Sequence, residues 1–271
     1  MNQFFRHLLL ALQFFTRIPV TGRLAGWVGF SPAMLRASAA HFPGVGWIVG
    51  GLTAVVLWGL LLLLPAVPAA PWVAVIASTV FGVLLTGAFH EDGLADLADG
   101  LGGSAQRERA LEIMKDSRIG SFGAIALVLA LLSKVALLAL LAQADAWLAV
   151  VALFAAHVSS RTVPLLVIRT LPHVGDTPQS KSKPLAESIG NGGLAAGLLW
   201  WALAMALAVW LMPDAPWAQA VLGALIGLAW MWRLLQRRLQ GFTGDGLGAT
   251  QQVSEVLFYL GLALSLPMGS P

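Results

Sequence analysis

The sequence lacks cysteine and contains few charged residues. Without cysteine, disulfides, thiolate metal sites and cysteine nucleophiles are excluded. Charged residues make up 11% of the chain, against roughly 25% in soluble domains, whereas 58% of its residues are hydrophobic. The nucleotide-binding motifs GxxxxGKS/T and GxGxxG are also missing. The formal net charge of +3 is too modest to indicate nucleic-acid binding, and we attribute it to loops on one side of a membrane.

Long apolar stretches recur with short breaks, which predicts an all-α, polytopic integral membrane protein. The whole chain, residues 1–271, is expected to form a single membrane-embedded helical bundle. Arg6 and His7 interrupt the apolar residues 4–15, so we expect an N-terminal interfacial helix there instead of an eighth span. About seven transmembrane helices are predicted, over residues 42–64, 72–89, 122–141, 147–168, 193–212, 217–232 and 253–268.

The connections between these spans differ in their content of basic residues. One set, residues 65–71, 143–146 and 213–216, contains no Lys or Arg. Most of the Lys and Arg residues fall in the other set, residues 17–41, 90–121, 169–192 and 233–252. Because basic loops favour the cytoplasmic side, we predict a multi-pass protein of the cell inner (cytoplasmic) membrane. The acid-rich connection belongs to the basic set, so the predicted active site faces the cytoplasm.

The most informative segment is residues 90–103, which read HEDGLADLADGLGG. Asp92, Asp96 and Asp99 are spaced i, i+4 and i+7, so a helix places them within about a 60° arc of one face. Like charges on one helix face repel, and oxygen ligands favour a hard cation such as Mg²⁺. His90 adjoins these acids as a candidate base, with a capping role as the alternative. A solvated acidic loop is the competing interpretation, although it would not require the interleaved glycines.

Two further segments combine glycine with acidic residues. Residues 116–123, DSRIGSFG, supply Asp116 and Arg118 just before a predicted span. Residues 244–249, GDGLGA, form a second Gly-rich turn, whose Asp245 could complete a metal site or bind a ribose hydroxyl. Taken alone, the first segment equally fits a capped helix entry, and the second fits an ordinary Asp turn.

Three polar side chains fall within predicted spans, where charge is costly and usually faces a cavity or a partner. Lys134 lies in the middle of one span, and His157 and Arg161 are spaced i and i+4 on another. Arg161 suits two-donor binding of a phosphate and Lys134 a point contact, so both are candidate substrate ligands. An internal ion pair with an Asp residue is the alternative for the two bases, and simple packing is the alternative for His157.

Several motifs occur in an order typical of one family. The most specific is FHEDGLAD at residues 89–96, followed by Asp99-Gly100. The others are FFTRIP at 14–19, FPGVG at 42–46, EIMKDSRIG at 112–120, SR at 160–161 and TGDGLGA at 243–249. On these motifs the chain closely resembles the adenosylcobinamide-GDP ribazoletransferase (cobalamin synthase) family over nearly its whole length.

The resemblance implies a Mg²⁺-dependent membrane transferase of cobalamin (vitamin B12) biosynthesis. Its members join adenosylcobinamide-GDP to α-ribazole, or to α-ribazole 5′-phosphate, by phosphoryl transfer that releases GMP. These small molecules and membrane lipid are the expected partners. The resemblance does not decide whether the protein forms a homo-oligomer. We expect Asp92, Asp96 and Asp99 to hold the metal and to act in catalysis together with His90. The expected substrate-binding residues are Asp116, Arg118, Lys134, Arg161 and Asp245.

Two other classes compete with this interpretation. CDP-alcohol phosphotransferases of phospholipid synthesis also place helix-borne Asp residues around Mg²⁺. Their pattern Asp-Gly-x-x-Ala-Arg, with later Asp residues four apart, is not matched downstream of Asp92. A cation transporter with an acidic gate would carry acids within its spans. The predicted spans carry almost none, and Glu255 is placed at the entrance of the last one.

Overall fold

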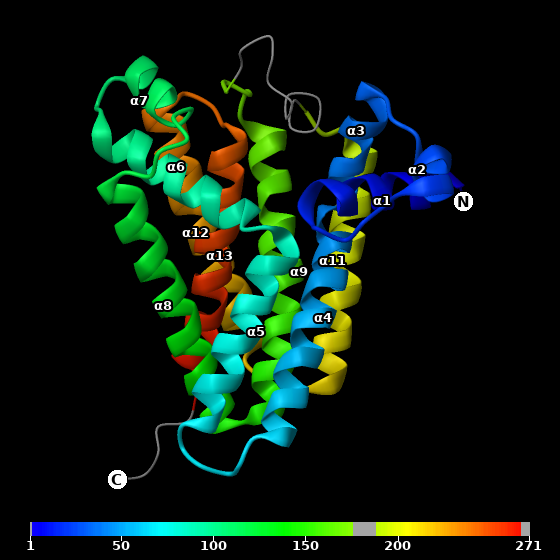
Figure 1. The fold of residues 1–271 in the computed structure, drawn as a ribbon, viewed down its shortest axis with the longest axis vertical. Coiled ribbons are helices and arrows are strands. Elements are labelled where there is room, and N and C mark those ends of the chain that lie inside the picture. Colours follow the sequence, from blue (N-terminus) through cyan, green and yellow to red (C-terminus); the bar gives the residue numbers. More distant parts are fainter. Residues whose placement is uncertain (1, 176–187, 267–271) are drawn as a thin grey trace.

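The computed structural model describes residues 2–175 and 188–266, which fold almost entirely into helices. Figure 1 shows a bundle of long helices, with α1, α2, α3, α6 and α7 gathered toward one end. The helices are α1 (Asn2–Phe15), α2 (Gly22–Val28), α3 (Pro32–Ser38), the 3₁₀ turn η1 (Ala39–His41), α4 (Phe42–Leu63), α5 (Ala70–Thr86), α6 (Phe89–Gly103), α7 (Arg107–Ile113), α8 (Ser121–Ala144), α9 (Ala146–Thr170), α11 (Asn191–Leu211), α12 (Trp217–Arg238) and α13 (Gly244–Ala263).

Five helical segments are long and apolar enough to cross a membrane, and a sixth is gained if α5 and α6 are counted as one span. The five are Pro32–Leu63, which joins α3, η1 and α4, and then α8, α9, α11 and α12. The predicted polytopic helical bundle is therefore confirmed. The last predicted span, 253–268, falls on α13, which is long enough to cross a membrane but not apolar enough. Residues 267 and 268 lie outside the described residues.

The N-terminal helix α1 runs across the long axis of the bundle (Figure 1). This is the direction expected for a helix that lies in the membrane interface. Arg6, which interrupts the apolar run, donates from Nε to the carbonyl of Val28 at 2.8 Å and so attaches α1 to α2. Leu10, Leu12 and Phe15 of α1 are buried.

Helix α9 occupies the centre of the bundle and is buried along most of its length. Small residues allow its neighbours to approach closely, as is usual in membrane bundles. A Cβ added to Gly46 of α4 would lie 2.6 Å from the carbonyl oxygen of His157, and one added to Gly50 would lie 2.9 Å from the His157 Cβ. These contacts fix the turn of α9 that carries His157 and Arg161.

Helix α13 packs against α6, α8, α9 and α12, so its polar side chains face protein instead of lipid. Gly227 of α12 lies against α13, where an added Cβ would be 3.0 Å from the Cα of Ser254. The composition of α13 explains why it fails the test for a span. Gln251, Gln252 and Glu255 lower its hydropathy, and all three are buried.

Helices α5 and α6 meet at an angle of 86°. The turn is made by Gly87 and Ala88, which adopt the left-handed backbone region with φ of 66° and 59°. The guanidinium of Arg17 lies against Gly87 and leaves no room for a side chain there. The bend directs α6 across the end of the bundle, and this places its acidic residues outside the five spans.

Candidate active site

The three aspartates of α6 have different surroundings. Asp92 is exposed, Asp96 is half-buried and Asp99 is buried. The two carboxylate oxygens of Asp99 accept backbone N–H groups, from Gly120 at 2.7 Å and from Gly123 at 2.8 Å. Both glycines lie at the start of α8, where an added Cβ would overlap the carboxylate. Asp99 therefore fixes the N-terminus of α8 to α6.

Asp245, at the start of α13, joins Asp92 and Asp96 to form an acidic cluster of three carboxylates. Burial and the charges of Asp245, Asp92 and Asp99 raise the pKa of Asp96 to about 7. Burial and the charge of Asp92 raise the pKa of Asp245 to about 6. Among the described residues, none of the three side chains makes a hydrogen bond or an ion pair. A bound cation would relieve the mutual repulsion that these shifts reflect.

This acidic cluster fits a magnesium ion in its chemistry, because all its donors are carboxylate oxygens. Among the described residues, no group of three or more His, Asp or Glu side chains is placed to hold a metal ion by itself. Mg²⁺ is usually held by one or two carboxylates together with substrate phosphates, and an open acidic cluster suits that arrangement.

His90, the first residue of the acidic motif, is buried at the start of α6. Its ring stacks on Phe15 of α1, with ring centroids 5.7 Å apart and planes 15° apart, and meets Phe89 edge to face. The imidazole lines a cavity that opens to the outside. The residues lining this aromatic cavity are Phe14, Phe15, Phe42, Phe89, His90, Arg161, Pro164, Gly244, Leu247, Gly248 and Gln251.

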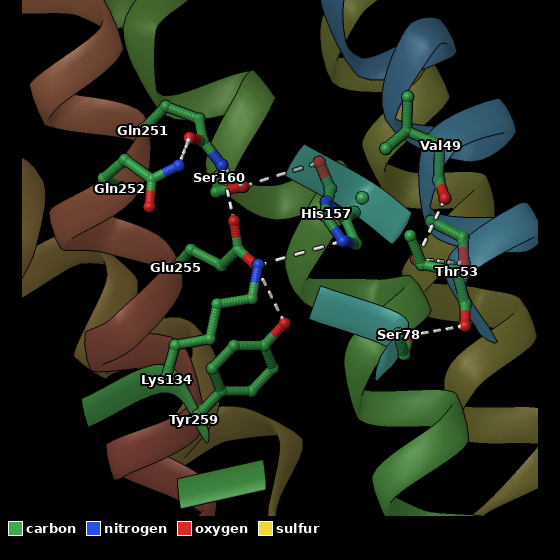
Figure 2. Close-up of polar contacts among 12 residues, drawn as sticks. Val49, Thr53, Ser78, Lys134, His157, Ser160, Gln251, Gln252, Glu255 and Tyr259 are labelled. Carbon is green, nitrogen blue, oxygen red and sulfur yellow. Dashed lines mark hydrogen bonds and ion pairs between the residues drawn. The ribbon is translucent and has the colours of Figure 1, made fainter. Parts of the chain in front are cut away.

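Beneath the acidic cluster lies a buried polar network centred on Glu255 of α13, which is 1% exposed (Figure 2). One carboxylate oxygen of Glu255 lies 2.6 Å from the ammonium of Lys134 and accepts the hydroxyl of Tyr259 at 3.0 Å. The other accepts the amide of Gln251 at 2.6 Å. Lys134 is thus held in an internal ion pair, and its partner is Glu255, not an Asp residue.

The same network continues to α6 through neighbouring glutamines. The amide of Gln251 also donates to the hydroxyl of Ser160 on α9 at 2.8 Å. The amide of Gln252 donates to Gln251 at 3.0 Å and to Glu91 at 3.0 Å. The second carboxylate oxygen of Glu91 is buried and has no partner among the described residues. Glu91 is therefore a buried acid on the face of α6 opposite to solvent.

Arg161 of α9 lies between this network and the aromatic cavity. Its Nη1 is 2.9 Å from the Nδ1 of His157 and donates to the His157 carbonyl at 3.1 Å. Its buried Nε–H has no partner within the described parts of the chain. The side chain lines the aromatic cavity and also a smaller polar cavity that includes Glu91. Arg161 thus keeps a free donor beside two cavities.

Asp116 and Arg118 pair with each other on the loop before α8. The guanidinium of Arg118 donates from Nη2 to the Asp116 carboxylate at 2.6 Å, and the Arg118 side chain is 86% exposed. Hydrogen bonds from Arg118 lower the pKa of Asp116 to about 2. The structure does not join this pair to the acidic cluster. The loop meets α6 at Gly120, whose N–H donates to Asp99.

Comparison with known proteins adds evidence that geometry alone does not provide. The family model described as cobalamin-5-phosphate synthase matches residues 7–263. The chain belongs to this family. It is 62% identical to the adenosylcobinamide-GDP ribazoletransferase of Albidiferax ferrireducens, over 98% of this chain and all of the relative. It is 57% identical to the enzyme of that name from Polaromonas sp., over 98% of this chain and 99% of the relative. No solved structure matches this one.

Membership of the cobalamin-5-phosphate synthase family confirms the resemblance seen in the sequence motifs. The chain is accordingly a membrane transferase of cobalamin biosynthesis. Family membership favours the predicted ribazoletransferase over the CDP-alcohol phosphotransferase and the cation transporter.

One residue of this family member was misplaced from the sequence. Glu255 was expected at the entrance of a span, but α13 begins at Gly244, so Glu255 lies near its middle. The signal for Glu255 was available, because Gln251, Glu255 and Tyr259 recur every four residues and so form one polar stripe of a helix.

Proposed function

We propose that this chain joins adenosylcobinamide-GDP to α-ribazole, or to α-ribazole 5′-phosphate, and releases GMP. The observation that carries the proposal is the acidic cluster of Asp92, Asp96 and Asp245, which lacks a cationic partner among the described residues. A pyrophosphate substrate brings additional negative charge, so such a cluster needs a metal ion to bind it. The printed activity of the full-length relatives agrees with this chemistry.

In the proposed reaction, a ribose hydroxyl of ribazole attacks the phosphorus atom attached to cobinamide. A new P–O bond forms to ribazole, and the P–O bond to the GMP phosphate breaks. The hydroxyl proton must pass to a base, for which we propose His90 because its imidazole lines the aromatic cavity. The protein otherwise positions the two substrates and stabilises charge, as in other phosphoryl transfers.

We propose that Asp92, Asp96 and Asp245 hold Mg²⁺. When bound there, Mg²⁺ would neutralise pyrophosphate oxygens and stabilise the departing GMP. Asp99, expected from its spacing to be a third ligand, already accepts two backbone N–H groups. We therefore propose for Asp99 a positioning role, in which it holds the start of α8 beside the acidic cluster.

We propose that Arg161 binds substrate, because its Nε–H is buried without a partner and borders the aromatic cavity. The charge of Lys134 is matched by Glu255, which supports a structural role for Lys134. Asp116 and Arg118 lie exposed on the loop before α8, within reach of solvent-borne substrates. Their contribution to substrate binding stays a prediction.

We propose the cytoplasmic (inner) membrane as the location, with the acidic cluster facing the cytoplasm. The connection before α5 and those between α8 and α9 and between α11 and α12 contain no Lys or Arg. The connections at the end that carries α6 and α7 contain nearly all the basic residues outside the spans. This asymmetry supports the orientation.

The decisive experiment uses the full chain purified in lipid. It is incubated with Mg²⁺, adenosylcobinamide-GDP and α-ribazole, and the products are separated by liquid chromatography and identified by mass spectrometry. We expect GMP and a cobamide in equal amounts, and neither product when divalent ions are chelated. Release of cobinamide phosphate without GMP, or undiminished turnover under chelation, would show the proposal to be wrong.

A further inference from the structure

The aromatic cavity beside His90 has no task in the phosphoryl transfer itself. Resting on the proposed function, we propose that this cavity binds the aromatic base of the ribazole nucleoside. Three elements contribute phenylalanines to its wall: α1 with Phe14 and Phe15, α4 with Phe42, and α6 with Phe89. No part of the reacting phosphate needs such a lining.

The phenylalanines surround the cavity with ring edges and faces. Phe15 meets Phe42 at a centroid distance of 4.6 Å and Phe89 at 5.2 Å, both edge to face. Phe14 meets Phe89 at 5.3 Å in the same manner. Flat aromatic ligands bind favourably against such rings by stacking and by edge-to-face contacts. The wall therefore favours a planar heterocycle over a flexible or charged group.

The size of the cavity distinguishes between the parts of the two substrates. The cavity opens to the outside, and the space that its walls enclose is about 40 Å³. That space can take the edge of one planar ring, whereas the corrin macrocycle with its amide side chains is far larger than a nucleoside. The corrinoid must therefore bind outside this cavity.

The polar groups of the cavity distinguish the ribazole base from guanine. A ribosylated benzimidazole has one ring nitrogen that accepts a hydrogen bond and no N–H donor, whereas guanine needs acceptors for its N–H groups. Among the described residues that line the cavity, none carries a carboxylate and Arg161 is the one Lys or Arg. The unpartnered Nε–H of Arg161 can donate a hydrogen bond to the nucleoside. The Arg161 guanidinium can also make a cation–π contact with the face of the base.

The position of the cavity suits delivery of the ribose to the acidic cluster. Gly244 and Gly248 line the cavity and flank Asp245 in the sequence. An added Cβ on Gly248 would lie 3.3 Å from the His90 carbonyl oxygen, so α13 and α6 are in close contact there. A base held among the phenylalanines thus has its ribose beside His90 and Asp245.

The first test varies the ligand and leaves the protein intact. Equilibrium binding of α-ribazole, of its analogue without the two methyl groups, and of GMP is measured on the full chain in lipid, without Mg²⁺. Each buried methyl group should strengthen binding about fourfold, and GMP should not compete with α-ribazole. Equal affinity for the two nucleosides, or competition by GMP, would overturn the proposal.

The second test uses Phe14→Leu, with Phe5→Leu as a matched control on the same helix, where Phe5 is exposed and lies outside the cavity. We expect Phe14→Leu to weaken α-ribazole binding about three- to tenfold, as expected for loss of an aromatic contact. Its KM for adenosylcobinamide-GDP should change less than twofold, and the control should match the wild type in both values.

The two proposals fail in different ways. If the wild type releases GMP but Phe14→Leu raises the KM for adenosylcobinamide-GDP instead, the assignment of the aromatic cavity is wrong and the proposed function stands. If α-ribazole binds with the expected methyl dependence but no GMP forms, the cavity assignment stands and the proposed function is wrong. Displacement of α-ribazole by added phospholipid would assign the cavity to an acyl chain and overturn the inference.

Discussion

Gly93 of α6 lies directly against the backbone of Asp245. A Cβ added to Gly93 would come within 3.0 Å of both the Cα and the carbonyl oxygen of Asp245. Helices α6 and α13 therefore touch backbone to backbone at the point where their aspartates meet. The acidic cluster depends on this contact, because any side chain at position 93 would push Asp245 away from Asp92.

The substitution Gly93→Ala tests this dependence. Overpacking usually costs about 1–3 kcal/mol of stability, and here it should also separate the proposed metal ligands. We expect a lower melting temperature and weaker activation of GMP release by Mg²⁺, measured by thermal unfolding and by titration of the metal. Gly51→Ala on α4, where no atom lies within 4 Å of the added Cβ, is the control. Unaltered Mg²⁺ activation in Gly93→Ala would contradict the prediction.

The charges of the acidic cluster are tested by Asp92→Asn, Asp96→Asn and Asp245→Asn. Loss of one electrostatic contact at a reacting charge typically slows turnover about 10²–10³-fold, and we expect that range for each variant at saturating Mg²⁺. Asp214→Asn, at an exposed residue between α11 and α12, should behave as the wild type. Rates within a few-fold of the wild type for two of the three variants would exclude the proposed metal site.

Asp99→Asn separates a positioning role from metal binding. The asparagine can accept only one of the two N–H groups now bonded to Asp99, so the start of α8 should lose about 1 kcal/mol, as for other lost caps. We expect a lower melting temperature with an unchanged Kd for Mg²⁺, measured by calorimetry. The opposite result, normal stability with weakened Mg²⁺ binding, would restore Asp99 as the metal ligand that its spacing predicts.

The ion pair of Lys134 and Glu255 is tested by a double-mutant cycle. Lys134→Met leaves a buried carboxylate without its cation, which typically costs about 3–5 kcal/mol. The double variant Lys134→Met/Glu255→Gln should be more stable than the single variant Lys134→Met, because no charge is left unpaired. Unfolding in denaturant measures all four proteins. Purely additive effects would mean that the two side chains do not interact energetically.

Topology is tested by single cysteines, which the cysteine-free chain accepts without background labelling. Ala105→Cys lies just after α6 and Ala69→Cys just before α5, and both positions are exposed. In intact cells an impermeant thiol reagent should label position 69 and not position 105. Labelling of position 105 from outside would reverse the proposed orientation and separate the acidic cluster from cytoplasmic nucleotides.

The spans were predictable because a membrane imposes a length and a composition on each crossing helix. The acidic motif was predictable because its residues are close in sequence, so helix periodicity alone places them on one face. The Gly-rich turn of Asp245 indicated that this residue could complete a metal site. How it meets α6 could not be predicted, because that depends on the packing of α6 and α13 at Gly93.

The roles of buried polar residues were the least predictable part of the site. Lys134 and Glu255 lie on α8 and α13, far apart in the sequence, so their pairing is a property of the tertiary fold. The bond from Gly120 to Asp99 likewise joins two segments across the α7 region. In contrast, the pairing of Asp116 with Arg118 is local and could have been expected from a spacing of two residues.

The bend between α5 and α6 has a consequence for the biogenesis of the protein. Had α5 continued straight into α6, the acidic residues would have lengthened a crossing helix instead of lying across the end of the bundle. By turning at Gly87 and Ala88, the chain ends its apolar segment after the 17 residues of α5. The insertion machinery therefore meets a short apolar segment followed by a polar one, and the carboxylates never have to enter lipid.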